Sequence, residues 1–417
     1  MNEFTSIVLG DHIKTLTDYH SNGSYETLKK NVTLKSSPDY AIMIRTLNFE
    51  RPDFEKDLIY LNEEEYNYLR KTKVYPNDIL MNKIANPGSV YLMPDLAKPV
   101  SLAMNLFLIR FDEKVNQQFM YYLMKTNEAY IKLFANGTTT LTITKDSVKS
   151  LTFKVPSLNT QNKIAQILSD IEAKIQINNK INAELEAMAK LIYDYWFVQL
   201  DFPNANGKPY KSSGGKMVYN EELKRDIPEG WAVKALTKEM DVQYGYPFST
   251  KLFNEDKFGA PVIRIRNILD NSISMYSTEE ADKKYLLEKG DLLIGMDGNF
   301  HLNFWDKDGC YLNQRCVRIR SRKNSTVSHF QALFQIAPYI KAREKNVSRT
   351  TVGHLSAKDI NDLKVLIPIP SKVNESRVFF DSTLEKIVLN RSENSKLIEL
   401  RDWLLPMLMN GQVTVTS

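Results

Sequence analysis

The sequence contains little cysteine and little histidine. Of its 417 residues, two are cysteines and five are histidines. Both cysteines, Cys310 and Cys316, lie in one short segment, so a zinc site built from Cys and His ligands is not expected. We expect both thiols to be reduced, as in a cytoplasmic protein.

Long apolar runs are also missing. No stretch of about 18 consecutive apolar residues occurs, which predicts that no helix spans a membrane. The N-terminal segment has no basic stretch followed by an apolar core, so no secretion signal is expected. With 43% hydrophobic and 25% charged residues, the composition is that of an ordinary soluble protein, and the length predicts two or three domains.

Proline and glycine are absent from one long stretch, Asn159–Phe197. Its apolar residues recur at steps of three and four, which predicts a helix with one narrow apolar seam for a partner helix. At about 1.5 Å per residue this helix is about 57 Å long, so it is expected to act as a spacer. The seam consists of Ile164, Leu168, Ile171, Ile175, Asn178, Asn182, Leu185, Ala189, Ile192 and Trp196.

A second stretch of the same type closes the chain, from Ser371 to about Leu408. Ser371 is the expected N-cap, and Pro406 predicts a kink or fraying near the end. Its seam is predicted to contain Phe380, Leu384, Ile387, Arg391, Asn394, Ile398, Leu405 and Leu408.

Both predicted helices are polar near their middle, at Asn178 and Asn182 in the first and at Arg391 and Asn394 in the second. If the helices pair antiparallel, these positions meet in a buried polar layer, which costs stability but fixes register. The alternative, in which each helix packs only on its own domain, stays open at this point.

The chain repeats itself at about half its length. The segment Ile42–Phe49 resembles Val262–Ile268, and Tyr75–Lys83 resembles Glu288–Met296 with Asp78 over Asp291. The segment Gly137–Ser157 resembles Arg349–Ser371, and each long helix follows this third match. A repeat this long indicates a duplicated domain rather than a solenoid.

The repeat predicts an α+β protein with a quasi-twofold internal repeat: two similar mixed α/β heads separated by two long antiparallel helices. The expected boundaries are 1–156 for the first head, 157–199 for the central helix, 200–230 for a connector, 231–370 for the second head and 371–417 for the C-terminal helix. Within the heads, strands are expected at Tyr40–Leu47, Pro261–Arg266, Asp78–Met81, Asp291–Ile294, Leu102–Phe111 and Cys316–Arg322, and helices at Gln117–Phe134 and Val327–Arg343.

Two similar heads at a fixed separation suit two similar targets at a fixed separation. An antiparallel rod would hold the heads at most about 50 Å apart. Dimeric readers of B-DNA bind half-sites one or more turns apart, at about 34 Å per turn, so the rod would act as a ruler.

Positive charge is concentrated in the globular segments. Residues 200–370 carry 26 basic and 21 acidic side chains, whereas residues 1–156 carry 19 and 18. Arginines on alternate positions of a strand share one face, where they could contact phosphates or simply form a solvated surface. The candidates of this kind are Arg315, Arg318, Arg320 and Arg322, with Arg264 and Arg266 on another strand.

Base reading needs side chains with paired donors or acceptors, and the loops after the Asp78 and Asp291 strands offer them. The candidates there are Asn82, Lys83 and Asn86 in the first head and Asp297, Asn299 and His301 in the second. Further candidates for DNA contact are Thr138, Thr139, Lys251, Arg349 and Thr350.

Several segments together resemble the specificity subunit of Type I restriction–modification systems. They are the helix end LIYDYWF, the connector QLDFPNANGKPYKSSGGKMVYNEELKRDIPEGW, the segment PFSTKLFNEDKFGAPVIRIRNI and the segment GDLLIGMDGNF followed by YLNQR. The resemblance covers essentially the whole chain, and the first head matches mainly by position and by the repeat.

The resemblance implies a non-catalytic, DNA-binding subunit. Each head would be a target-recognition domain for one half of a bipartite, asymmetric site on double-stranded DNA. The expected partners are two methyltransferase (modification) subunits that bind S-adenosylmethionine and restriction (translocase/nuclease) subunits that hydrolyse ATP with Mg²⁺. No cofactor is expected on this chain itself.

Other classes of function have weaker support in the sequence. Pro94-Asp95 followed by Asp112-Glu113-Lys114 fits a loose nuclease pattern, but the second copy has no counterpart. A self-sufficient methyltransferase would need a glycine-rich cofactor loop, and no GxGxxG occurs. A helical adaptor without DNA contact remains an alternative, and it predicts no salt-dependent DNA binding by either head.

Overall fold

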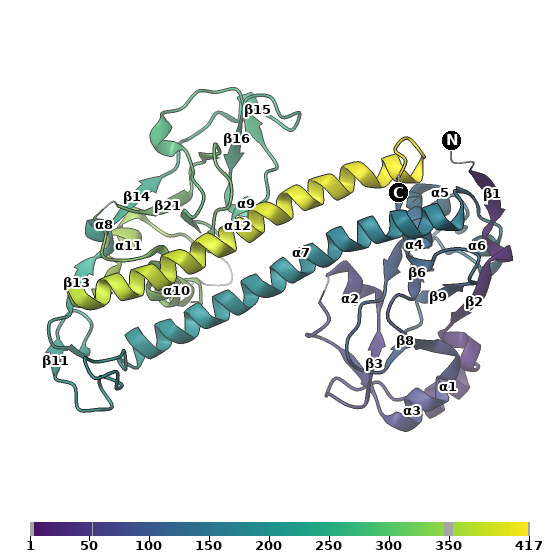
Figure 1. Ribbon diagram of the computed structural model, residues 1–417, viewed down its shortest axis with the longest axis horizontal. Coiled ribbons are helices and arrows are strands. Elements are labelled where there is room, and N and C mark those ends of the chain that lie inside the picture. Colours follow the sequence, from purple (N-terminus) through teal and green to yellow (C-terminus); the bar gives the residue numbers. More distant parts are fainter. Residues whose placement is uncertain (1–3, 52, 323, 346–352, 416–417) are drawn as a thin grey trace. The chain divides into compact units, whose positions relative to one another are not determined.

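The computed structural model describes residues 4–51, 53–322, 324–345 and 353–415 (Figure 1). The chain divides into two compact units. Unit 1 contains residues 1–173 and 397–417, and unit 2 contains residues 174–396. Unit 1 is therefore completed by the last segment of the chain, whereas unit 2 is continuous.

The first head, in unit 1, is built around three small sheets. Its elements are β1 (Thr5–Val8), β2 (Ile13–Asp18), α1 (Tyr25–Asn31), β3 (Ala41–Ile44), α2 (Thr46–Glu50), β4 (Ile59–Leu61), α3 (Glu63–Tyr68), β5 (Lys73–Val74), β6 (Ile79–Asn82), β7 (Val90–Leu92), β8 (Val100–Leu102), β9 (Leu106–Phe111), α4 (Gln117–Thr126), α5 (Glu128–Lys132), α6 (Lys145–Lys149) and β10 (Thr152–Val155). The strand orders are β2-β9-β6-β7, β4-β3-β8-β5 and β1-β10.

The second head, in unit 2, has the same plan. Its elements are β13 (Ala232–Ala235), α8 (Leu236–Glu239), β14 (Met240–Tyr244), β15 (Phe253–Asn254), β16 (Ala260–Ile263), α9 (Ile265–Ile268), β17 (Tyr276–Ser277), β18 (Leu292–Gly295), β19 (Leu302–Phe304), β20 (Tyr311–Leu312), β21 (Cys316–Ser321), α10 (His329–Lys345), α11 (Ala357–Asn361) and β22 (Lys364–Ile367). The strand orders are β14-β21-β18-β19, β15-β17-β16-β20 and β13-β22.

The two heads share most of their strand pairings, so the predicted α+β class and internal repeat are confirmed. Only β5 and β15 differ among the described strands, since isolated bridges, Leu286–Tyr311 and Lys35–Tyr60, take their places in the other head. The order β2-β9-β6-β7 is repeated as β14-β21-β18-β19, and the parallel pair β3–β8 is repeated as β16–β20. The antiparallel pair β1–β10, which precedes the first long helix, is repeated as β13–β22 before the second.

A buried Asp–Arg constellation is duplicated along with the strands. In the first head, Arg110 of β9 donates to both carboxylate oxygens of Asp78, at 2.6 Å each, and the carboxylate also accepts from the backbone N–H of Tyr75. In the second, Arg320 of β21 donates to Asp291, at 2.6 and 2.7 Å, and Asp291 accepts from the N–H of Glu288. Buried charges of this kind need such complete pairing.

The long helices are α7 (Leu158–Tyr193), followed by a π-helical turn at Asp194–Val198, and α12 (Pro370–Met409). In unit 1, Ile164 and Leu168 near the start of α7 share a core with Leu408 near the end of α12. In unit 2, Ala189 near the end of α7 shares a core with Phe380 near the start of α12. The helices therefore pair antiparallel while each also packs on a head.

Nearly all predicted seam residues of the two helices are largely buried. Two predictions for α12 need correction, one in the seam and one at the N-cap. Ile398 is 39% exposed, because the buried stripe continues from Asn394 by a step of three, through Leu397 and Arg401, instead of a step of four. Ser371 is not the N-cap, since the helix already begins at Pro370. Proline suits this first position because its missing N–H would have had no helical partner.

A polar layer lies in the helix pair of unit 2, as the sequence predicts. Asn178 donates to Asn394 at 2.8 Å, and Asn390 donates to Asn182 at 2.8 Å. In the same way, Asn182 contacts the carbonyl of Ile387, and Asn394 contacts the carbonyl of Ile175, each at 3.5 Å. These four contacts form two equivalent pairs, so this part of the helix pair has a local quasi-twofold symmetry. The bonds from Asn178 to Glu393 and from Asn394 to Asn179 lie outside it.

Four element predictions in the heads need correction. The single strand expected at Leu102–Phe111 is two, because β8 ends at Leu102 and β9 begins at Leu106. The strands expected at Tyr40–Leu47 and Pro261–Arg266 end at Ile44 and Ile263, and each turns into a short helix, α2 or α9. In both heads the turn is fixed by an asparagine three residues on, because Asn48 and Asn267 accept from the backbone N–H of Arg45 and Arg264 at 3.0 Å. The single helix expected from Gln117 is split at Asn127 into α4 and α5.

The connector carries its own structure. It contains the hairpin β11 (Met217–Asn220) and β12 (Arg225–Pro228). Phe202 stacks on Tyr210 and on Trp231, and all three lie against the end of α7 in one core. Residues 200–230 are therefore packed onto unit 2, and the predicted domain boundaries stay predictions.

Candidate nucleic-acid interface

A basic hollow of about 420 Å³ lies in the second head, where several predicted DNA-contacting residues meet. It is open to solvent, and its walls come from the start of α9, the loop between β18 and β19, and the turn before β21. Its lining residues are Arg264, Ile265, Arg266, Asn299, His301, Asn313, Gln314 and Arg315. The fold thus brings together five residues that were predicted separately from the sequence.

Arg315 is held in place within this hollow by an acidic partner. Its Nε donates to Asp297 at 2.5 Å, Nη2 bonds the same carboxylate, and the ring of His354 contacts both groups. The hydrogen bond from Arg315 holds the pKa of Asp297 at about 2, so the carboxylate is ionised at neutral pH. Arg315 has φ +68°, a conformation that non-glycine residues adopt rarely and that often marks a functional position.

Arg264 and Arg266 do not alternate on a strand face, contrary to the prediction. Arg264 precedes α9, its guanidinium is half-buried against Phe253 and Ser274, and burial lowers its pKa. Arg266 lies within α9 and is exposed to solvent. Of the two, Arg266 is the one placed to meet a phosphate.

The exposed basic face predicted for β21 is absent, because its arginines are used within the fold. The side chain of Arg318 is only 5% exposed; it pairs with Asp241 and donates to the carbonyls of Lys284 and Leu286. Arg320 is bound to Asp291 and Glu288. Arg322 is exposed, yet it donates to the carbonyls of Thr237 and Lys238. Arg318 and Arg320 are therefore structural residues, and the phosphate-binding prediction is wrong for them.

In the first head, the predicted base-reading residues are largely engaged in the fold. Asn82 is buried at the end of β6, and Lys83 pairs with Asp18 at 2.8 Å. Lys145 binds the same carboxylate at 2.9 Å, and although burial opposes it, these two lysines lower the pKa of Asp18 strongly. Asn86 is exposed, with its amide bonded to Ser89 and to Lys132.

The remaining candidates lie in exposed loops or outside the described residues. Thr138 and Thr139 are exposed in the loop before α6, and Lys251 is exposed in a short 3-10 turn. Arg349 and Thr350 lie outside the described residues.

Sequence reasoning missed Asn313, Gln314 and His354. Asn313 and Gln314 directly precede Arg315, so extending that candidate by two residues would have included them. In the sequence repeat, His354 aligns with Thr142, and the structure gives both the same place, since His354 bridges to Asp297 as Thr142 does to Ile84.

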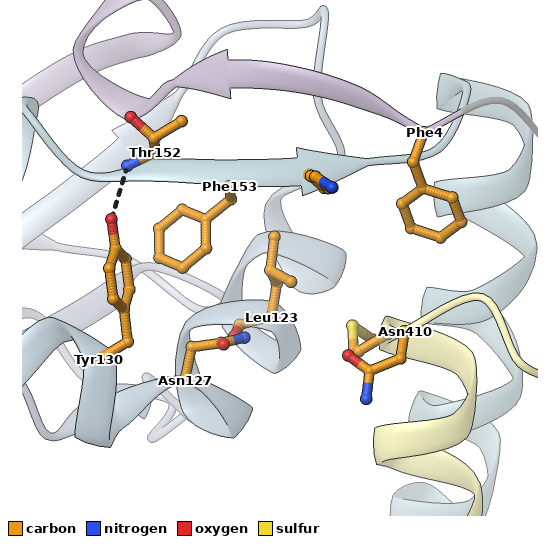
Figure 2. A pocket seen from close by; sticks show the side chains of 9 residues that line it. Phe4, Leu123, Asn127, Tyr130, Thr152, Phe153 and Asn410 are labelled. Atoms are coloured by element: carbon orange, nitrogen blue, oxygen red, sulfur yellow. Dashed lines mark hydrogen bonds between the residues drawn. The ribbon is translucent and has the colours of Figure 1, made fainter.

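A second hollow, of about 510 Å³, lies in unit 1 between α4, β10 and the end of α12 (Figure 2). Aromatic and amide side chains line it, with Phe4 and Tyr130 at opposite ends, and the Tyr130 hydroxyl lies 3.5 Å from the backbone N–H of Thr152. Lys154 is the one charged residue among the described residues that line it, so these residues offer little to a charged ligand.

Other site chemistries find little support in the part of the chain that the structure describes. No group of three or more His, Cys, Asp or Glu side chains is arranged to hold a metal there, and no helix there is long and apolar enough to cross a membrane. Asp112, part of the nuclease-like pattern, pairs with His12 and accepts from the N–H of Lys114. Cys310 and Cys316 are both buried free thiols.

Comparison with known proteins identifies this arrangement. The family model described as the Type I restriction modification DNA specificity domain matches twice, over residues 13–187 and 228–399. These matches span both heads and most of both long helices.

Two curated relatives and one solved structure extend along most of the chain. The MjaIX specificity subunit of Methanocaldococcus jannaschii is 24% identical over 384 residues, covering 86% of this chain and 84% of the relative. The HindI specificity subunit of Haemophilus influenzae is 24% identical over 412 residues, covering 82% and 88%. The crystal structure of a Type I S subunit from M. genitalium superimposes with a TM-score of 0.58 at 17% identity, covering 97% of this chain and 96% of that one, which bears on the fold.

The duplicated head, the long helix after each copy and the two family matches agree with one another. The chain belongs to the Type I restriction–modification DNA specificity family, the non-catalytic subunits that give these systems their DNA sequence specificity.

Proposed function

We propose that each head reads one half of a bipartite, asymmetric DNA site, and that the long helices set the gap and dock two methyltransferase subunits. One observation carries the first part: the heads share a scaffold and differ in the side chains of three loop positions. We call these positions the reading edge; they are 84, 105 and 142 in the first head and 297, 315 and 354 in the second. The Asp–Arg constellation is the same in both heads, whereas the Asp297–Arg315–His354 cluster is replaced by Ile84, Asn105 and Thr142 in the first. One scaffold with two different reading edges suits two different half-sites.

The backbone supports this correspondence position by position. The N–H of Lys83 donates to the carbonyl of Asn105, and the N–H of Met296 donates to the carbonyl of Arg315. The residue after each donor, Ile84 or Asp297, forms the bridge to Thr142 or His354. The side chains therefore differ on backbones that are tied in the same way.

The exposed apolar residues of the helices support docking of two copies of one partner. Ile177, Met188 and Leu191 of α7 are 54%, 42% and 68% exposed, and their spacing places them on one side of the helix. The equivalent positions of α12 are Leu389, Leu400 and Trp403, which are 59%, 43% and 55% exposed. Large apolar side chains left in water at matching positions are typical of a repeated docking surface.

The chemistry of the system belongs, in this proposal, to the partners. The methyltransferase subunits would bind S-adenosylmethionine, the restriction subunits would use ATP and Mg²⁺, and the complex would work in the cytoplasm. This chain would supply DNA binding alone, and that binding should weaken steeply with salt because phosphate contacts release counterions.

The test is methylome sequencing of cells that carry the intact operon, with and without this gene. We expect one two-part methylated motif to disappear on deletion. Removing seven residues from each long helix should change the gap in the motif and leave both half-sites unaltered. An unchanged methylome, together with no salt-dependent DNA binding by the purified complex, would contradict the proposal and favour a helical adaptor.

The docking surface is tested by placing a charge on it. In the purified complex, Leu191→Glu or Trp403→Glu should each remove one methyltransferase subunit, and the double variant should remove both, as measured by mass photometry. Gln176→Glu, an exposed position on another side of α7, is the matched control. Two subunits retained by the double variant would rule out this surface.

A further inference from the structure

We infer that Arg315 reads a guanine in the half-site of the second head and that Asp297 positions it for that contact. The inference rests on the proposed DNA-reading function and adds a base and a residue to it. It starts from the difference between Arg315 and the other arginines of the hollow.

Arg315 is accessible to a ligand, although part of its guanidinium is bound within the fold. Its side chain is 39% exposed and lines the hollow, although its Nε and Nη2 are bound to Asp297. Among the residues that the structure describes, no hydrogen-bond partner is found for its other terminal nitrogen, Nη1. The bound edge fixes the plane of the guanidinium, so the outer edge is aimed before any ligand arrives.

This geometry favours a base over a phosphate. The Asp297 carboxylate neutralises most of the charge on Arg315, and phosphate affinity comes from net positive charge. The two N–H groups of Nη1, held in a fixed plane, can instead meet the two acceptors of guanine, O6 and N7, which no other base presents together. The hollow provides space for a base edge beside Arg315.

Arg266 has the opposite properties and serves as the matched control. It lines the same hollow and is exposed, and no ion-pair partner is found for it within the described ranges. An exposed cation of this kind suits a phosphate, and such a contact carries no sequence information. The two arginines of one hollow are therefore assigned different tasks.

The first head lacks this device, because Ile84, Asn105 and Thr142 hold the equivalent positions. The guanine assignment accordingly concerns the second half-site alone. Changes at Arg315 should leave the preference of the first half-site unaltered.

The experiment uses the full chain in complex with its modification subunits. The probes are the duplex that carries the methylated motif and a panel of duplexes, each with one base pair of the second half-site replaced. We expect the wild-type complex to prefer a G·C pair at one position by about tenfold to a hundredfold. Arg315→Ala should reduce that preference to within about twofold and keep every other preference.

Two further variants separate the possible roles. Arg266→Ala should weaken binding to all duplexes about equally and lower the slope of log affinity against log salt by about one. Asp297→Asn should lose discrimination at the same base pair as Arg315→Ala while binding unrelated DNA at least as well, since a negative charge is removed.

The outcomes are distinguishable. Uniform weakening by Arg315→Ala, as for Arg266→Ala, would reassign Arg315 to phosphate binding and overturn the inference. Unchanged preferences would make the cluster structural and also overturn it, while the proposed function would stand. If Arg315→Ala fails to fold, Arg315→Gln keeps a polar side chain without the guanidinium and should show the same loss of the preference for guanine. A wild-type complex with no bipartite preference would instead refute the proposed function itself.

Discussion

The two heads have the same buried Asp–Arg pairs, which we call the shared frame, and different side chains at their solvent-facing reading edges. Asp78 with Arg110 and Asp291 with Arg320 are the same constellation, down to the backbone N–H that each carboxylate accepts. At the reading edge, the second head has the ion cluster Asp297–Arg315–His354, whereas the equivalent positions of the first head hold neutral side chains. Duplication thus preserved what the strands need in order to pair and left the solvent-facing edge free to diverge.

The heads also differ in how the helix beside the last strand is fastened. In the second head, Gln335 of α10 bonds both the N–H and the carbonyl of Leu366 in β22. In the first head, Leu123 of α4 holds the corresponding place, and the hollow of Figure 2 lies between α4 and β10. The second head is therefore closed by hydrogen bonds where the first is left open.

The largest expected effect comes from breaking the shared frame. Asp291→Ala and Asp78→Ala should each lower the free energy of unfolding by about 3–5 kcal/mol, because each removes the buried carboxylate that binds both Nε and Nη2 of a half-buried arginine. Urea denaturation measures the loss. Asp308→Ala, which removes an exposed ion pair with Lys289, should cost less than about 1 kcal/mol. A large loss at only one of the two aspartates would contradict the equivalence of the heads.

A pH-dependent effect distinguishes the heads. The Nε2 of His329 accepts from the N–H of Ser321 at 3.0 Å, whereas Gln117 accepts from the N–H of Phe111 at the equivalent place. Burial lowers the pKa of His329 to about 4, below its ordinary value of 6.5. Protonation therefore opposes folding, and stability that is complete above pH 6.5 should fall as the pH drops toward 4, by at most about 3 kcal/mol.

Hydrogen exchange of peptides from α4 and α10 between pH 7.5 and pH 5 measures this difference. We expect α10 to lose protection beyond the intrinsic pH effect on exchange, and α4 to keep it. His329→Gln should make the two helices behave alike. Equal protection changes of α4 and α10 in the wild type would contradict the prediction, because protonation of His329 would then not destabilise α10.

The smallest effect concerns the asparagine layer. Because Asn182 and Asn394 occupy equivalent places, Asn182→Ala and Asn394→Ala should cost about the same, about 1–2 kcal/mol each in thermal unfolding, since each removes a hydrogen bond between the helices. Replacing both Asn178 and Asn394 by Leu should be nearly neutral for stability and should loosen the register. Unequal costs of the two alanine variants would argue against the local quasi-twofold symmetry.

The fold could be predicted from the sequence as far as periodicity reaches. The apolar spacing located both long helices to within a few residues, and the polar positions located the asparagine layer. The register failed only at Ile398, where steps of three and four are equally allowed and packing decides between them. The strand ends at Ile44 and Ile263 were missed because the asparagines that turn the chain, Asn48 and Asn267, lie beyond the apolar run.

The site could be predicted only in part. Composition and loop position identified Arg264, Arg266, Asn299, His301 and Arg315 before any of them was known to share a hollow. The same reasoning failed for Arg318 and Arg320. Alternation shows that two arginines share a face but does not show which carboxylates lie opposite, and Asp241 of β14 and Asp291 are far from them in sequence.

The division of the chain has a consequence for synthesis. Unit 2 is complete once residue 396 has been made, but unit 1 needs Leu408 and Met409 of the last segment to close its core against Ile164 and Leu168. At about 5–20 residues per second, the first head must wait about 10–50 seconds for the rest of the chain to be translated. A premature stop near the C-terminus would therefore damage the half of the molecule that was made first.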